Sequence, residues 1–117
     1  MQSLIKDINL AAEGRKKIDW VSNFMPTLNT LGDRFEAEQT FKGQTIVVSV
    51  HLEAKTAYLA TVLKRGGADV IVTGSNPLST QDDVAAGLVD MGLTVYAWYD
   101  CTEEEYFHFL NKALDHK

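Results

Sequence analysis

Polar side chains that could bind a ligand or exchange a proton follow two apolar runs of this sequence. Residues 51–56 (HLEAKT) come directly after the run 45–50, and residues 74–82 (GSNPLSTQD) come after the run 69–73. A histidine can exchange a proton near neutral pH. Hydroxyl, amide and carboxylate groups give a pocket its orientation and specificity. Together these residue types predict a site for a small polar molecule such as a nucleoside.

The same residues have a second, structural interpretation. Asn76, Ser79 and Asp82 are residue types that commonly form turns and helix caps. A lone histidine such as His51 also often serves as a structural hydrogen-bonding group, although here its neighbours could orient it. Residue types alone leave both interpretations open.

Periodicity predicts the elements that position these residues. Helices are expected from an N-cap at Asn9 onward and over 27–38, with Pro26 in the first turn. The apolar runs 45–50 and 69–73 predict strands buried on both faces, and 93–98 predicts a third strand. Further helices are expected over 54–65, from a cap at Ser79 or Thr80 to about residue 91, and from a capping box at 102–105 to about residue 114.

Short strands joined by helices indicate a parallel sheet with right-handed crossovers. The expected fold is α/β: a single-domain, three-layer Rossmann-like fragment with about three parallel strands flanked by helices. Residues 1–41 form a helical lead-in of two helices, and residues 43–117 form a βαβαβα unit. Ligands bind beyond the carboxyl ends of such strands, where residues 51–56 and 74–82 are predicted to lie. Because parallel sheets are usually larger, something is expected to extend this one.

Composition argues against several classes of protein. The formal net charge is −5 and the basic residues are scattered, which disfavours nucleic-acid binding. We find no signal peptide and no apolar stretch long enough for a membrane span, so a cytoplasmic protein is expected. The single cysteine, Cys101, is expected to be an inert thiol. No metal-ligand set and no glycine-rich nucleotide-binding motif is recognised, and His108 and His116 are expected at the surface. The aromatic residues Trp20, Phe24 and Phe35 are expected in the core or an interface.

The residues at the predicted site resemble a known family. Residues 75–86 (SNPLSTQDDVAA) are similar to the signature N-[PI]-x-S-T-Q-D of S-adenosylhomocysteine hydrolases, and residues 51–57 match that family's H-[LM]-x-x-x-T-A. Residues 5–20, 25–26, 42–43, 95–98 and 102–106 also resemble family segments in the same order. The resemblance covers nearly the whole chain.

This resemblance implies an activity and roles for residues. The family's enzymes use bound NAD to oxidise the ribose 3′-hydroxyl, release homocysteine, add water and reduce the ketone again. By the match, His51 corresponds to a pocket histidine implicated in acid–base work at the 5′ position. Thr56 falls on a residue that hydrogen-bonds the purine, and Asn76 lies near homocysteine. The implied substrate-binding residues are Leu52, Glu53, Lys55, Thr56, Ser75, Asn76, Ser79, Thr80, Gln81 and Asp82.

One departure from the family bears on the purine. Lys55 stands where many members carry a glutamate facing the purine amino group, and Glu53 replaces a threonine. An ammonium group only donates hydrogen bonds, so Lys55 suits a purine with a carbonyl at position 6, such as hypoxanthine. The alternative is that Lys55 points to solvent and Glu53 accepts from the amino group.

The chain does not contain the family's NAD-binding domain. We therefore expect no cofactor in this chain. The expected partner is a complementary chain that holds NAD and supplies the remaining domains, and self-association is the alternative. On this hypothesis the chain alone is inactive. The other hypothesis is a non-catalytic nucleoside-binding or protein-interaction relative, or a degenerate remnant.

Overall fold

The computed structural model describes residues 3–115, so the expectation for His116 lies outside the described residues. A short 3-10 helix, Ile8–Leu10, leads into α1 (Ala11–Ser22). The prediction that Asn9 caps this segment was wrong, because the Asp7 carboxylate accepts the Asn9 N–H at 2.9 Å and caps the 3-10 helix instead. Helix α2 (Pro26–Glu38) begins at Pro26, whose missing N–H would have had no partner in a first turn.

Three parallel strands form the sheet, in the order β1 (Thr45–Val50), β2 (Asp69–Gly74) and β3 (Thr94–Tyr96). Leu4 adds a parallel bridge on the far side of β3, where its N–H donates to Val95 O at 2.8 Å and its carbonyl accepts from Ala97 at 2.9 Å. This bridge protects the β3 edge. In the part of the chain that the structure describes, no strand pairs with the other edge, at β1.

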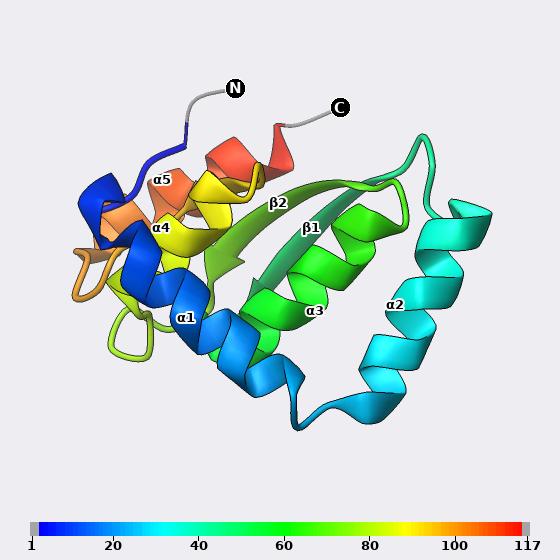
Figure 1. Ribbon diagram of the computed structural model, residues 1–117. Coiled ribbons are helices and arrows are strands. Elements are labelled where there is room, and N and C mark those ends of the chain that lie inside the picture. Colours follow the sequence, from blue (N-terminus) through cyan, green and yellow to red (C-terminus); the bar gives the residue numbers. More distant parts are fainter. Residues whose placement is uncertain (1–2, 116–117) are drawn as a thin grey trace.

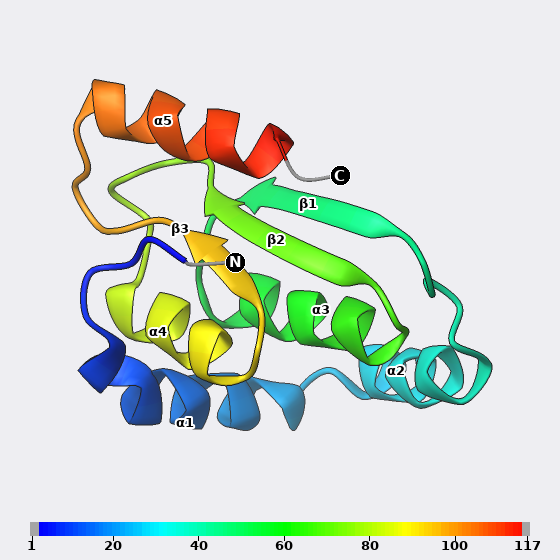
Figure 2. The same cartoon turned by 90° about the horizontal axis from the view of Figure 1, so that it is seen from above.

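Helices cover the two faces of the sheet unequally, as Figure 2 shows. Helices α3 (Ala54–Arg65) and α4 (Asp82–Asp90) lie on one face, and α5 (Glu103–Leu114) lies on the other. The predicted capping box at the start of α5 is confirmed, with Thr102 as the N-cap and Glu105 as its partner. The predicted cap of α4 was wrong: Gln81 occupies the N-cap position, and the hydroxyls of Ser79 and Thr80 bond to Asn76 instead.

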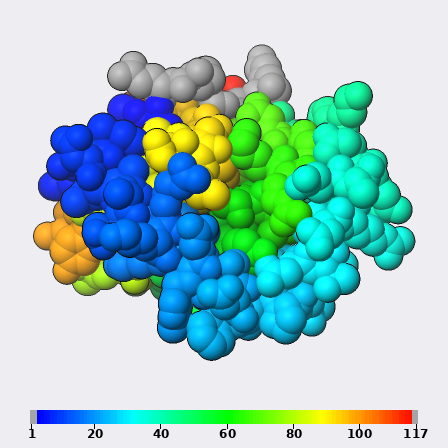
Figure 3. Space-filling model, viewed as in Figure 1, coloured from blue at the N-terminus to red at the C-terminus, as the bar shows by residue number. Residues whose placement is uncertain are grey.

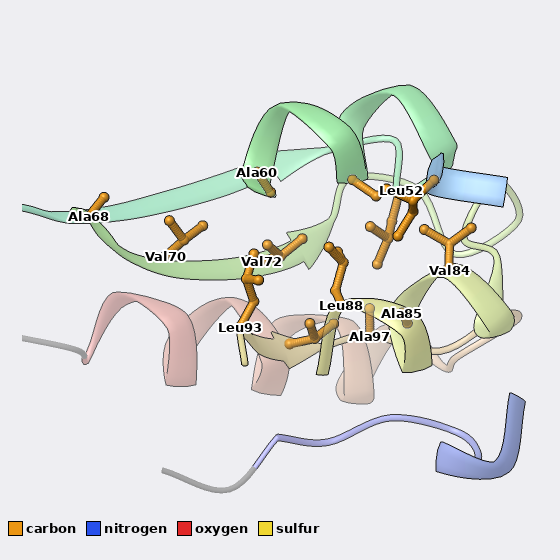
Figure 4. Close-up of a cluster of buried hydrophobic side chains, with 13 residues drawn as sticks. Leu52, Ala60, Ala68, Val70, Val72, Val84, Ala85, Leu88, Leu93 and Ala97 are labelled. Carbon is orange, nitrogen blue, oxygen red and sulfur yellow. The ribbon is translucent and has the colours of Figure 1, made fainter. Parts of the chain in front are cut away.

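The main core lies between the sheet and the pair α3 and α4 (Figure 4). Its buried side chains are mostly small and branched, which lets helices and sheet approach closely. A second cluster joins α5 to the other face through Phe109, Ala113, Ile71 and Tyr96. The buried members of the main cluster are Ile18, Leu52, Ala57, Ala60, Ala68, Val70, Val72, Val84, Ala85, Leu88, Leu93, Val95 and Ala97.

The first strand departs from the sequence prediction. Strand β2 is buried as expected, but β1 is not buried on both faces, and Val47 and Val50 are 36% and 44% exposed. Val47 pairs in register with Ile71 and therefore shares the face that α5 covers. Helix α5 packs on β2 and β3, which leaves β1 uncovered on this face, while Ile46 and Val48 on the other face pack against the main core.

Helices α1 and α2 form an outer layer on α3 and α4 rather than on the sheet (Figures 1 and 3). The Arg65 guanidinium joins α3 to α2 through Asp33 at 2.8 Å and Glu36 at 2.7 Å. Trp20 and Phe24 are not core residues: their rings contact each other in a tilted arrangement, 4.7 Å between centroids, but remain 64% and 65% exposed. Among the described residues, no helix has the length and apolar composition that crossing a bilayer requires.

Candidate functional site

The carboxyl ends of the parallel strands bring the predicted site segments to one edge of the sheet. His51 follows β1 directly, and Ser75 follows β2. Tyr99 lies in the loop after β3, where its N–H donates to the Asp82 carboxylate at 2.8 Å. Asp82 therefore ties the loop after β3 to the start of α4. The three strand exits lie together, as expected for a ligand-binding edge.

Asn76 shapes the loop between β2 and α4. Its side-chain oxygen accepts the Leu78 N–H at 2.9 Å, which forms an Asx turn. Its backbone carbonyl accepts from the Ser79 N–H at 3.1 Å, the Ser79 hydroxyl at 3.0 Å and the Thr80 hydroxyl at 3.2 Å. These bonds fix Ser79 and Thr80 relative to the backbone. The structural interpretation of Asn76 thus holds, whatever else it binds.

A side-chain contact joins the first two strand exits. His51 Nδ1 lies 2.6 Å from the Ser79 hydroxyl oxygen, across a separation of 28 residues in the sequence. The His51 ring is exposed at the edge of the sheet. The Ser79 hydroxyl is fixed by its hydrogen bond to the Asn76 carbonyl. His51 is therefore held by a fixed partner and still open to a ligand.

An open groove runs between the loop after β1 and the loop after β2. Seven of the predicted residues line it, and Val50, Leu78 and Tyr99 complete it. Sequence reasoning did not include these last three in the site. Tyr99 could have been found from its place directly after the predicted third strand, and its side chain is 49% exposed, which suits stacking on a flat ring. The seven are His51, Glu53, Lys55, Thr56, Ser79, Thr80 and Gln81.

Four predicted residues lie outside this groove lining. The Leu52 side chain is fully buried in the main core, and its carbonyl accepts the Gln81 N–H at 3.0 Å. This burial leaves the side chain no surface for a ligand, so Leu52 acts on the site by joining its two loops. Asn76 and Asp82 hold the loops as described above. Ser75 is exposed, and its carbonyl accepts from the Tyr106 hydroxyl at 3.3 Å.

Glu53 and Lys55 sit at the start of α3 with different roles. One Glu53 carboxylate oxygen accepts the backbone N–H groups of Lys55 at 3.1 Å and Thr56 at 3.2 Å, and so caps the helix. The Lys55 side chain is exposed and forms no ion pair among residues 3–115. The groove therefore has a free ammonium group and a carboxylate already engaged with the backbone.

Cys101 does not line the groove and packs instead against the cluster under α5. Its thiol is half-buried beside Trp98, and burial raises the pKa of Cys101, with the nearby Glu105 carboxylate raising it further. A thiol with a raised pKa is a poor nucleophile at neutral pH. Within residues 3–115 no group of His, Cys, Asp and Glu side chains is arranged to hold a metal ion.

Comparison with known proteins decides the family. The sequence model described as S-adenosyl-L-homocysteine hydrolase matches residues 2–117, almost the entire chain. The chain belongs to the S-adenosyl-L-homocysteine hydrolase family. The resemblance on the 51–57 and 75–86 segments is thereby confirmed, and those segments form the groove described above.

Curated relatives in this hydrolase family carry two different names. The chain is 56% identical to an S-inosyl-L-homocysteine hydrolase of Methanocaldococcus jannaschii over 97% of its length, which is 27% of that relative. It is also 56% identical to an adenosylhomocysteinase of Pyrococcus abyssi over 95% of its length, which is 26% of that relative. An adenosylhomocysteinase of Saccharolobus solfataricus is 50% identical over 92% of the chain and 26% of the relative. The chain thus spans about a quarter of the length of these hydrolases, and overall identity does not separate the two names.

Proposed function

We propose that this chain supplies the nucleoside-thioether side of a hydrolase active site that cleaves S-adenosylhomocysteine or S-inosylhomocysteine to a nucleoside and homocysteine. The observation that carries the proposal is one groove at the carboxyl edge of the sheet, containing His51, Thr56 and the 79–81 loop in a chain of the hydrolase family. His51 would exchange a proton near the 5′ position of the ribose. Thr56 would bond the purine, and the exposed Tyr99 ring would stack on it.

The chain would work with a partner that supplies the rest of the family fold. Helix α5 lies on the opposite face from α3 and α4, so a right-handed crossover after α5 leads back toward β1. The open β1 edge is the position that a fourth parallel strand would take, and Val47 is exposed on the uncovered face beside it. An uncharged edge of this kind readily pairs with another strand.

Within residues 3–115, the starts of the two helices at the candidate site do not fit a dinucleotide cofactor. The helices that follow β1 and β2 begin at Glu53 and Gln81 N-caps, whereas pyrophosphate binding requires a glycine-rich turn. A carboxylate at the start of α3 would repel phosphate. NAD, which would supply the redox chemistry of the reaction, would be held by the partner chain.

Lys55 favours a purine that carries a carbonyl group. Its ammonium group is free at the groove, while one oxygen of the Glu53 carboxylate is engaged as a helix cap. A donor at this position would bond the 6-carbonyl of hypoxanthine, whereas the amino group of adenine would need the second Glu53 oxygen as its acceptor. Relatives of both names are equally similar overall, so this preference rests on Lys55 alone.

A complementation assay tests the activity. We would mix the chain with the remainder of the Methanocaldococcus jannaschii relative, add NAD, and measure homocysteine release from both thioethers. We expect release that needs both chains and that His51→Ala lowers at least about a hundredfold, the usual scale for an acid–base group. A stable complex with no release would instead favour a non-catalytic binding protein.

The purine preference is measured on the same assembly. Lys55→Glu should reverse a preference for the inosyl thioether, whereas Lys55→Met should weaken it without reversal. Equal behaviour of the three proteins would show that Lys55 points to solvent. A wild-type preference for the adenosyl thioether would show that Glu53, not Lys55, recognises the purine.

A further inference from the structure

The hydroxyl of Ser79 has two close partners but only one hydrogen. Its oxygen lies 3.0 Å from the Asn76 carbonyl oxygen, to which it can only donate, and 2.6 Å from His51 Nδ1. A neutral imidazole can donate from one ring nitrogen and accept at the other. The tautomer of His51 therefore depends on where the Ser79 hydrogen points.

When Ser79 donates its hydrogen to Asn76, the hydrogen in the contact with His51 must come from the imidazole ring. His51 then carries its hydrogen on Nδ1 and donates it to the Ser79 oxygen. The lone pair is on Nε2, the nitrogen that remains free at the exposed edge of the groove. Only this arrangement gives both contacts of the Ser79 oxygen a hydrogen, because donation from Ser79 to His51 would leave two oxygens 3.0 Å apart with no hydrogen between them.

We propose that Ser79 is a positioning residue that holds His51 in the Nδ1–H tautomer, with Nε2 as the nitrogen that exchanges protons with the substrate. The statement that Nε2 exchanges protons with the substrate rests on the proposed function, whereas the assignment of the tautomer does not. The family resemblance placed Ser79 among the substrate-binding residues; the geometry assigns it a role through His51.

In this arrangement His51 can act first as a base and then as an acid while its contact with Ser79 stays the same. The Nε2 lone pair takes a proton from the substrate or from water, which produces an imidazolium ion. The Nδ1–H of that ion still donates to Ser79, so the proton can return from Nε2 without any change at Nδ1. The hydroxyl oxygen also stabilises the cation, because hydrogen bonds to charged groups are stronger than neutral ones.

Nitrogen NMR on the 117-residue chain tests the tautomer directly. Long-range proton–nitrogen spectra distinguish a protonated ring nitrogen from a bare one, and they are recorded at about pH 8.5, well above the ordinary histidine pKa. His51→Gln identifies the His51 signals among the three histidines. We expect wild-type His51 to be protonated mainly on Nδ1. A spectrum with the hydrogen mainly on Nε2 would overturn the proposal.

Variants at position 79 show whether the hydroxyl is responsible. Ser79→Ala should lower the ratio of Nδ1–H to Nε2–H about fivefold, as expected for the loss of one net hydrogen bond. Ser79→Thr, which keeps a hydroxyl group, should restore the ratio. Ser75→Ala is the matched control, because Ser75 is an exposed serine at the same edge whose side chain does not bond His51. An unchanged ratio in Ser79→Ala would overturn the proposal.

Kinetics of the assembled hydrolase separate this inference from the proposed function. Ser79→Ala should lower kcat about tenfold or more with little effect on KM, and Ser79→Thr should recover kcat. If wild type shows no hydrolysis but the Nδ1–H tautomer is present, the proposed function fails and the tautomer assignment stands. If wild type hydrolyses the thioether but His51 carries its hydrogen on Nε2, the proposed function stands and the tautomer assignment fails.

Discussion

Gly14 of α1 lies directly against the backbone carbonyl group of Asp83 in α4. A Cβ atom built on Gly14 would be 1.7 Å from that carbonyl oxygen, far inside any real contact. The contact is reciprocal, since a Cβ on Gly87 of α4 would lie 2.9 Å from the Arg15 nitrogen. Lys17 adds an ion pair with Asp83 at 2.7 Å. The two glycines therefore let α1 hold the helix that begins at the site loop.

Substitution of Gly14 should unfold or strongly destabilise the chain. Gly14→Ala would force the α1 and α4 backbones apart and is expected to cost about 3 kcal/mol of unfolding free energy in urea titrations, the upper end for overpacking. On an exposed helix position, glycine to alanine would instead stabilise by up to about 1 kcal/mol. Ala12→Gly, on the exposed face of α1, gives that propensity effect as a control. A Gly14→Ala protein as stable as wild type would contradict this packing.

Removal of the Glu53 carboxylate should weaken the start of α3. Glu53→Ala loses the acceptor for the Lys55 and Thr56 N–H groups and should cost about 1 kcal/mol in urea unfolding, the usual value of an N-cap. Glu53→Gln keeps an acceptor oxygen and should retain most of that stability. Lys55→Ala is the control, because it removes an exposed side chain at the same end of α3 without removing the cap. An alanine variant as stable as wild type would show that the cap contributes nothing.

The ionised Glu105 carboxylate should stabilise the fold near neutral pH, and this stabilisation should be lost in acid. A hydrogen bond from the Thr102 backbone N–H, 2.8 Å from the carboxylate, holds the pKa of Glu105 below its ordinary value of 4.5. A carboxyl group with a lowered folded pKa stabilises the fold above its unfolded pKa, and this contribution disappears as pH falls through the folded pKa. Glu105→Gln should therefore be less stable than wild type at pH 7, and the difference should shrink below pH 4.5. A difference that is constant with pH would show that the charge plays no part.

The open β1 edge should control association with a partner chain. Val47→Lys places a charge on the uncovered face of the edge strand, where it should weaken assembly at least tenfold in analytical ultracentrifugation. Because Val47 is 36% exposed, the stability of the chain alone should change by no more than about 1 kcal/mol. Leu59→Lys, on a helix residue that is 39% exposed, is the matched control. Equal loss of assembly in both variants would place the interface elsewhere.

Local chemistry explains how much of the fold could be predicted. Pro26 at the start of α2 and the Thr102–Glu105 capping box were found from sequence because their effects act within one helical turn. The caps of the first helix and of α4 were misassigned because several capping residue types stand side by side there. Asp7 and the Asn76 turn took the hydrogen bonds that sequence had given to Asn9 and Thr80.

By itself, the sequence determined the order and type of the elements, the edge of the sheet where the candidate site residues gather, and the family. These follow from side-chain periodicity and from motifs that are contiguous in the chain. Only the tertiary structure decided that Val47 is uncovered, that Leu52 is buried, and that His51 meets Ser79. Burial and hydrogen bonding depend on which distant segments become neighbours. That choice is made by packing of the sheet and helices, not by any short stretch of residues.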